Sequence, residues 1–305
     1  MNAGRELRTG PSQAHIPELQ LRPLFLPPPG QEFAPAADLG DDTMEDDATT
    51  EPGVPEYNVF GVHPVEAERV FWYRWILGHQ ISFALWRAMY DIIGDRRDQM
   101  PSPPELESLA ACIDAYSAML LYSSTVPRAH YHSHIRHRMM LQHPAFSGTW
   151  APDYRPVRRL FRGRLPWQGD PSCEALGAAV TRNAEAHEYI AGHLVLNGRS
   201  LLQQSGQAAN LTVLRDKEEL YDNFFLTVRR PVSRIEFVRH LRERAAEVSA
   251  ELAHNGLYPN VDGHHHPVVT GPSGAVLITF VPSVLRILDR ATRLVAGQQL
   301  QGVGV

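Results

Sequence analysis

Aromatic side chains surround one histidine, His79, in the first half of the chain. At helical spacing, Trp75, Phe83 and Trp86 fall on the same face as His79. Burial among such rings lowers the pKa of an imidazole and keeps it neutral near pH 7. A neutral imidazole in a dry pocket accepts a proton from a phenol or relays one on a peroxide. His79 is therefore the candidate for proton transfer, and the alternative is a core histidine bound to a carbonyl group.

A second histidine, His187, is bordered by small side chains. On a helix, Ala184 and Ala191 lie about one turn away from it on the same face. Small neighbours leave room for a flat macrocycle to approach the ring nitrogen, and a neutral imidazole is a standard proximal ligand of haem iron. His187 is therefore a candidate iron ligand, and the alternative is that it is an ordinary histidine among the fifteen of the chain. His193 is the alternative ligand, but it lies well round the helix, beside Tyr189.

Other histidines suggest a different kind of metal site. His130, His134 and His137 fall on one face of a predicted helix, and residues 264–266 form a tract of three histidines. No Glu or Asp stands with them in the spacing of an HExxH motif or a facial triad, so this pattern is incomplete. A non-haem, histidine-rich metal-binding protein is the alternative class, and the tract is interpreted as a polar loop.

Helices must position these residues. Helix-start signals stand at Ser102, Asp170, Ser233 and Ser283, where a capping residue precedes Pro, Glu or an apolar periodic run. With the periodicity, they predict helices over Pro64–Gly94, from Ser102 onward, over Pro127–Gln142, Asp170–Gln203, Ser233–His254 and Ser283–Gly297. A small β-hairpin is predicted over Val268–Phe280. The predicted fold class is all-α.

Composition bounds the class of protein. The 305 residues are 43% hydrophobic, enough for a substantial core, and the net charge of −5 gives no reason to expect binding to nucleic acid or to an anionic membrane. The two cysteines, Cys112 and Cys173, form neither a CxxC pair nor a CxxCH haem-attachment motif. With no secretory signal and no apolar run long enough for a membrane span, we expect a cytoplasmic protein.

The chain divides into a leader and one domain. Residues 1–55 combine three consecutive prolines, 27–29, with an acidic run over residues 41–47, so we expect a largely disordered or extended leader. Part of it, Leu21 to Leu26, can still contact the domain or a partner subunit. Residues 56–305 are predicted to form a single helical catalytic domain.

Taken in order, three segments resemble the tryptophan 2,3-dioxygenase superfamily of haem-dependent aromatic oxygenases. Residues 75–86 are similar to the distal His-Gln pattern of the dioxygenases, with one extra residue before Leu85. Residues 187–195 look like their proximal-ligand pattern, with Ala191 where Val is usual, and this favours His187 over His193. Between them, Arg136 precedes the turn at residues 144–148, as the carboxylate-binding Arg of the dioxygenases precedes theirs.

One departure points to a branch of that superfamily. The Gly- and Ser-rich loop that holds the substrate of the dioxygenases is not preserved at residues 204–212, whereas residues 131–154 look like the tyrosine-hydroxylating branch, which consists of bacterial enzymes of antibiotic biosynthesis. The resemblance implies hydrogen peroxide as oxidant and free L-tyrosine as the aromatic amino acid, hydroxylated at ring position 3 to L-DOPA. A dioxygenase or monooxygenase of tryptophan or another indole is the alternative.

The resemblance also implies roles for residues. Haem b (iron protoporphyrin IX) is held by His187, His79 is the catalytic residue, and Trp75 and Phe83 wall the substrate ring. Arg136 binds the substrate carboxylate, because a guanidinium can bind a carboxylate bidentately; Arg128 and Arg138 are its substitutes. A homodimer is implied as well.

Overall fold

A computed structural model shows a helical protein. It describes residues 19–35, 64–94, 98–195, 199–206, 215–256 and 284–297. The α-helices are α1 (Pro64–Ile93), α2 (Pro103–Ser123), α3 (Arg128–His130), α4 (His137–Gln142), α5 (Tyr154–Phe161), α6 (Glu174–Leu194), α7 (Leu201–Gln204), α8 (Arg215–Phe224) and α9 (Arg234–Asn255), with a further helix over residues 284–297. The prediction of an all-α fold is confirmed.

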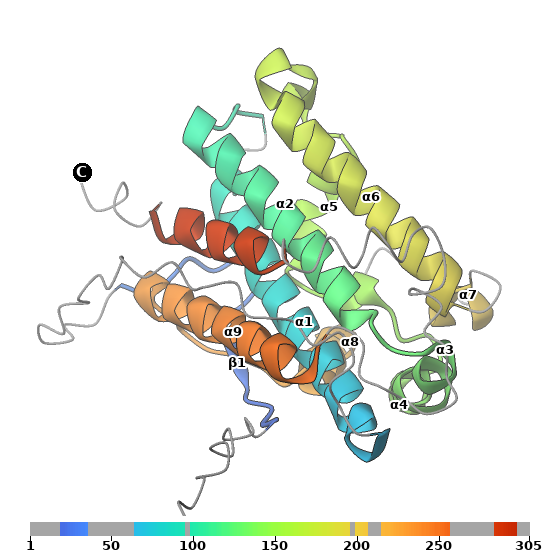
Figure 1. Ribbon diagram of the computed structural model, residues 1–305. Coiled ribbons are helices and arrows are strands. Elements are labelled where there is room, and N and C mark those ends of the chain that lie inside the picture. The colour runs from blue at the N-terminus through green and yellow to red at the C-terminus, as the bar shows by residue number, and fades with distance from the viewer. Residues whose placement is uncertain are drawn as a thin grey trace, which may run out of the picture.

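Helices α1 and α2 form the centre of the molecule. They pack along each other, α6 packs against α2, and α9 packs against α1 (Figure 1). Both central helices are apolar on most of their surface, which is the composition expected of buried helices. Gly78 permits their close approach, since a Cβ at this position would lie 2.1 Å from the Ser123 hydroxyl oxygen and 3.2 Å from the Met119 carbonyl oxygen.

The helix starts predicted from capping residues are largely confirmed. Ser102 precedes α2, and its backbone N–H donates to the Glu105 carboxylate at 2.7 Å. Ser233 precedes α9, where its hydroxyl oxygen accepts a hydrogen bond from the backbone N–H of Glu236. Asp170 caps a short 3₁₀ turn, η4 (Pro171–Cys173), which leads directly into α6.

Two details of the helices differ from the prediction. The helix predicted to run to Gln203 ends at Leu194, and Ser200 starts the separate helix α7; Asn197 and Gly198 between them are helix-stopping residues. The helix predicted over Pro127–Gln142 is interrupted by a π-helical segment, η1 (Tyr131–Arg136), between α3 and α4. The predicted hairpin at Val268–Phe280 lies outside the described residues.

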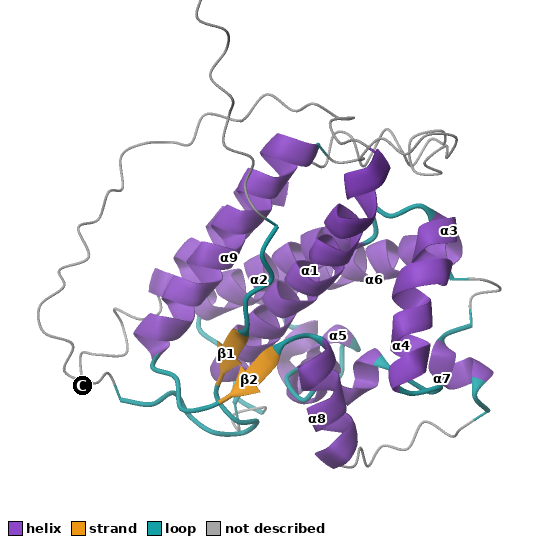
Figure 2. Ribbon diagram, turned by 90° about the horizontal axis from the view of Figure 1, so that it is seen from below, coloured by secondary structure: helices purple, strands orange, loops and turns teal. Residues whose placement is uncertain are grey.

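The leader contributes a strand to the domain. Strand β1 (Leu24–Leu26) pairs in parallel with β2 (Thr227–Arg229), which follows α8 (Figure 2). Leu24 and Leu26 are buried in the core. The segment Leu21 to Leu26, for which the sequence left open a contact with the domain, therefore lies against it.

A buried ion pair joins the central helices to α9. Arg74 on α1 donates to the Glu251 carboxylate on α9 at 2.8 Å, and both side chains are almost inaccessible to solvent. The Tyr122 hydroxyl on α2 also donates to Glu251, at 2.8 Å. Each charge thus has several partners, which is the condition under which a buried ion pair is tolerated.

None of the described helices is, by itself, both long and apolar enough to cross a membrane, although α2 and the helical run Arg128–Gln142 pass that test as a pair bent by 91°.

Candidate active site

His79 lies among aromatic rings, as its spacing predicts. Its ring centroid is 4.3 Å from that of Trp75 and 6.3 Å from that of Phe83, both on α1. Nδ1 lies 2.6 Å from the carbonyl oxygen of Trp75, so Nδ1 carries the proton and Nε2 carries the lone pair in the neutral ring. Burial lowers the pKa of His79 to about 4. The imidazole is therefore a neutral proton acceptor at physiological pH.

Phe225, from a distant part of the chain, also packs against His79. Its ring stacks on His79 with centroids 4.5 Å apart and planes inclined by 14°. The neighbouring Gln80 holds it there, because the Gln80 side-chain amide donates to the Phe225 carbonyl oxygen at 3.0 Å. The same amide nitrogen also donates to the Arg22 carbonyl oxygen in the leader. Sequence analysis missed Phe225, because local spacing does not connect it with His79.

Arg136 is a buried cation at the end of η1. It is 8% exposed, and its guanidinium donates to the Arg199 carbonyl oxygen at 3.0 Å. Within the described ranges no Asp or Glu forms an ion pair with it. Burying a guanidinium without a carboxylate has an unfavourable desolvation free energy. An anionic ligand that binds beside the guanidinium offsets this desolvation free energy. Of the two substitutes, Arg128 is exposed, and Arg138 lies over the ring of Trp72.

A chain of contacts links Arg136 to His79. Arg136 lies near the Tyr131 hydroxyl, where its positive charge partly offsets the rise in the pKa of Tyr131 that burial causes, and the Tyr131 ring lies 5.7 Å from the ring of Trp75. Trp75 in turn contacts His79. The structure thus brings His79, Trp75, Phe83 and Arg136 into one region, where α1 meets η1.

His187 stands in a gap on the packed face of α6. Leu176 and Asn183, which precede it on that face, are buried, and so is Leu194, which follows it. His187 and its neighbour Ala184 are exposed nevertheless. Nearby apolar groups still desolvate the ring and lower the pKa of His187. An exposed, neutral imidazole within an otherwise buried stripe is accessible to a ligand from that side.

Tyr116 on α2 holds this imidazole in place. Its hydroxyl oxygen lies 3.0 Å from His187 Nε2. Burial raises the pKa of Tyr116 well above its usual value, so the phenol stays protonated; it donates to Nε2 in one tautomer of His187 and accepts from Nε2–H in the other. An iron atom bound through Nε2 must replace this hydrogen bond. His193, the alternative ligand, is instead paired with its own helix, with Nδ1 2.8 Å from the Tyr189 carbonyl oxygen.

Aromatic rings connect the two histidines. Phe83 beside His79 stacks on Trp86 with centroids 5.5 Å apart, and Trp86 contacts Tyr116 at 5.1 Å. The helices that carry these rings, α1 and α2, pack along each other, and α6, which carries His187, packs against α2 (Figure 1). His79 and His187 therefore both contact one connected cluster of aromatic rings.

The residues fit a haem in two respects. A macrocycle needs an accessible imidazole with small neighbours, which His187, Ala184 and Ala191 provide. In addition, the indole N–H groups of Trp75 and Trp86 are buried without a hydrogen-bond partner within the described chain. Buried donors are rarely left unpaired, so polar groups of a ligand are suitable partners for them.

Only some of the histidines of the alternative metal site lie together in the part of the chain that the structure describes. His130 and His134 approach Glu68 on α1, a carboxylate that the sequence pattern did not place with them. His137 is exposed at the start of α4 and is not part of this cluster. The triple-histidine tract lies outside the described residues.

Comparison with known families points to an oxidoreductase. Residues 33–182, just under half of the chain, match the family described as SfmD 3-methyl-L-tyrosine peroxygenase. The matched region includes His79 and Arg136 and ends shortly before His187. Together with the all-α architecture, this similarity supports a peroxygenase-type enzyme. No curated protein matches the chain.

Proposed function

We propose that the protein is a histidine-ligated haem peroxygenase that hydroxylates free L-tyrosine at ring carbon 3, as part of antibiotic biosynthesis. In this reaction L-tyrosine and hydrogen peroxide give L-DOPA and water. The similarity to a family described as 3-methyl-L-tyrosine peroxygenase supports the class of reaction. The resemblance of residues 75–86, 136–148 and 187–195 to the haem-dependent aromatic oxygenases supports the cofactor, haem b.

The observation that carries this proposal is the link between His79 and Arg136. A free amino acid presents a carboxylate at one end and a ring at the other. Arg136 offers a buried guanidinium that has no acidic partner among the residues that the structure describes, and Trp75 with Phe83 offers aromatic walls beside His79. Aromatic walls with a few convergent polar groups are the usual build of such a pocket.

The proposed roles follow from the protonation states. If bound by His187, haem would activate hydrogen peroxide for oxidation of the substrate. His79 keeps its Nδ1 proton on the Trp75 carbonyl oxygen and accepts a proton at Nε2, from peroxide or from the substrate phenol. Removing the phenol proton increases the electron density of the neighbouring ring carbon. Phe225 and Trp75 cover part of the imidazole, and this desolvation keeps it neutral.

The name of the matched family favours a second substrate of the same chemistry. Its members are described as acting on 3-methyl-L-tyrosine. The carboxylate and phenol of that molecule are those of L-tyrosine, so Arg136 and His79 serve both in the same way. Turnover with peroxide of L-tyrosine, 3-methyl-L-tyrosine and L-tryptophan, compared by product analysis, decides the substrate. Turnover of L-tryptophan alone would contradict the proposal.

Three variants test the assignment of the iron ligand. His187→Ala is expected to lose the Soret band on purification, whereas His79→Ala keeps the band and loses turnover by about 10²–10⁴-fold, the usual contribution of a general acid–base group. Tyr116→Phe is expected to keep both, because it removes only a hydrogen bond that iron replaces.

Each result that differs from these expectations favours a different assignment. Haem retained in His187→Ala contradicts the ligand assignment and favours His193. Haem lost in Tyr116→Phe means that Tyr116 is the ligand, since a tyrosinate also binds haem iron. Wild-type protein that is colourless after reconstitution with haem contradicts the proposed cofactor.

A further inference from the structure

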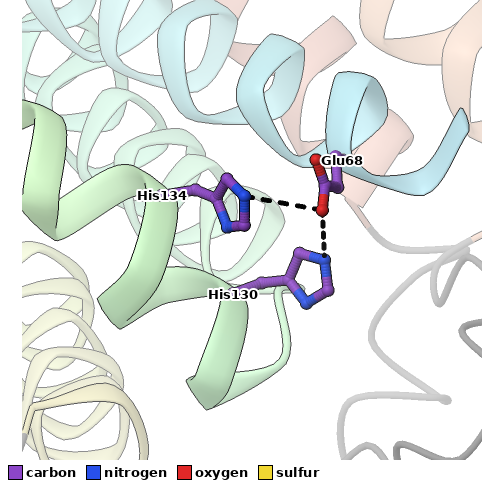
Figure 3. Close-up of side chains that lie close together, drawn as sticks. All are labelled: Glu68, His130 and His134. Atoms are coloured by element: carbon purple, nitrogen blue, oxygen red, sulfur yellow. Dashed lines mark ion pairs between the residues drawn. The ribbon is translucent and has the colours of Figure 1, made fainter. Parts of the chain in front are cut away.

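A second cluster of metal-binding side chains lies outside the proposed haem site. Glu68 near the start of α1 faces His130 and His134, which lie at the junction of α3 and η1 (Figure 3). Nε2 of His130 is 3.2 Å and Nε2 of His134 is 3.5 Å from the same Glu68 oxygen. All three ligand atoms lie within 4.8 Å of one another. The cluster therefore joins two elements that are distant in sequence.

Its dimensions match those of a transition-metal site. Ligand atoms about 2.0–2.2 Å from a zinc ion lie about 3.3–3.6 Å apart at the corners of a tetrahedron. The two distances between His nitrogens and the Glu68 oxygen are close to this range. His130 and His134 are spaced as i and i+4, the spacing with which one helix face offers two imidazoles to zinc. Their rings are stacked, with centroids 5.3 Å apart, so both present Nε2 on the same side.

The cluster faces a pocket rather than packed protein. It shares a cavity of 170 Å³ with Phe71, Trp72 and Ile135, and with two basic side chains, Arg69 and Arg138. Three protein ligands beside a cavity leave a fourth coordination position for water or an exogenous ligand, the arrangement of an open zinc site. The two guanidinium groups favour an anion as that ligand.

We propose that Glu68, His130 and His134 bind a divalent transition-metal ion of the zinc class, with its fourth position open to this pocket. The site is independent of haem and of the proposed function. A metal bound here links the first turns of α1 to η1, the segment that carries Arg136. Metal binding therefore stabilises the segment on which the proposed carboxylate-binding residue lies.

Zinc binding by the untagged, haem-loaded protein tests the proposal. After equilibrium dialysis against Zn²⁺, elemental analysis is expected to find one tightly bound zinc per chain. His134→Ala and Glu68→Gln should each weaken zinc binding by at least about tenfold, because even supporting residues of metal sites contribute 10–100-fold. His134 is 45% exposed, so its replacement does not disturb the core.

Two control variants identify the source of any bound zinc. His137→Ala removes an exposed histidine at the start of α4, outside the cluster, and should bind zinc like the wild type. Replacement of His264, His265 and His266 by Ala tests the histidine tract and should also leave this zinc in place. Zinc should raise the melting temperature of both controls but not that of His134→Ala.

Two results would overturn the proposal. The first is zinc binding that is absent from the wild type or unchanged in His134→Ala and Glu68→Gln. The second is loss of the Soret band in His134→Ala, because it would mean that the cluster serves haem instead. Failure of the haem assignment at His187 leaves the zinc result unaffected, so the two proposals are tested separately.

Discussion

At the scale of single residues, His79 illustrates how a neutral imidazole is prepared. Three aromatic rings, those of Trp75, Phe83 and Phe225, contact it, and a backbone carbonyl fixes its tautomer. Burial lowers the pKa of His79 from 6.5 to about 4. At pH values near 7 the imidazole is therefore unprotonated and can accept a proton.

The lowered pKa predicts the pH dependence of turnover. Since the neutral form persists until the pH approaches 4, kcat/KM should show no inflection between pH 7 and pH 5 and should fall below that range. Folding favours the neutral ring, so the contribution of His79 to stability is fully present above pH 6.5 and is lost as the pH falls toward 4. A pH–rate profile, with an NMR titration of His79, measures both. An inflection near 6.5 assigned to His79 would contradict the buried, neutral imidazole.

The sequence predicted part of this site. The spacing of Trp75, His79 and Phe83 within one helix is sufficient to place them on one face, and the structure confirms it. Phe225 could not be predicted, because it reaches His79 through tertiary packing after the turn that follows α8. For the same reason Glu68 could not be joined to His130 and His134, since local spacing carries no information about which helices meet.

At the scale of elements, Gly78 sets how closely α1 approaches α2. An added methyl group at this position meets the Ser123 hydroxyl and the Met119 carbonyl oxygen. Gly78→Ala is therefore expected to lower the free energy of unfolding by about 1–3 kcal/mol, as other overpacked cores do. It should also disturb the adjacent His79 and reduce turnover. Urea denaturation and steady-state kinetics measure these effects.

Gly177 on α6 is the matched control for this prediction. A Cβ there meets nothing within 4 Å. Gly177→Ala should thus raise the free energy of unfolding by about 0.5–1 kcal/mol, because alanine is the better helix former. Equal effects of the two substitutions would show that helix propensity, and not the contact between α1 and α2, determines the role of Gly78.

Elements were predicted with unequal success, for a physical reason. Helix starts were found because capping residues act locally, as at Ser102 and Ser233. The π-helical segment Tyr131–Arg136 was not found, because its sequence has the same apolar spacing as an α-helix. Such segments recur at functional sites. Here one carries both Tyr131 and Arg136 of the proposed carboxylate-binding region.

At the scale of the whole molecule, the ion pair between Arg74 and Glu251 connects α9 to the central helices. Glu251→Ala leaves a buried guanidinium without its carboxylate, and the expected loss is about 3–5 kcal/mol in the free energy of unfolding. That is a large share of the stability of a typical domain. Chemical denaturation, followed by circular dichroism, measures it.

The exposed pair Arg290–Glu107 provides the comparison. Glu107→Ala removes a surface ion pair and should change the free energy of unfolding by less than about 1 kcal/mol. A double variant, Arg74→Met with Glu251→Leu, should recover part of the loss, because it leaves no unpaired charge. If Glu251→Ala were as mild as Glu107→Ala, the buried pair would not be what holds α9.

The pairing of β1 with β2 also has a consequence for the order in which the protein folds. A ribosome completes Leu24–Leu26 early, but their hydrogen-bonding partners, Thr227–Arg229, emerge only after most of the chain has been made. Contacts of such long sequence separation form slowly. Phe225 lies just before β2, so the ring that covers His79 arrives in the same late step. A nascent chain stalled before this point contains His79, the proposed proton acceptor, but not the ring that stacks on it.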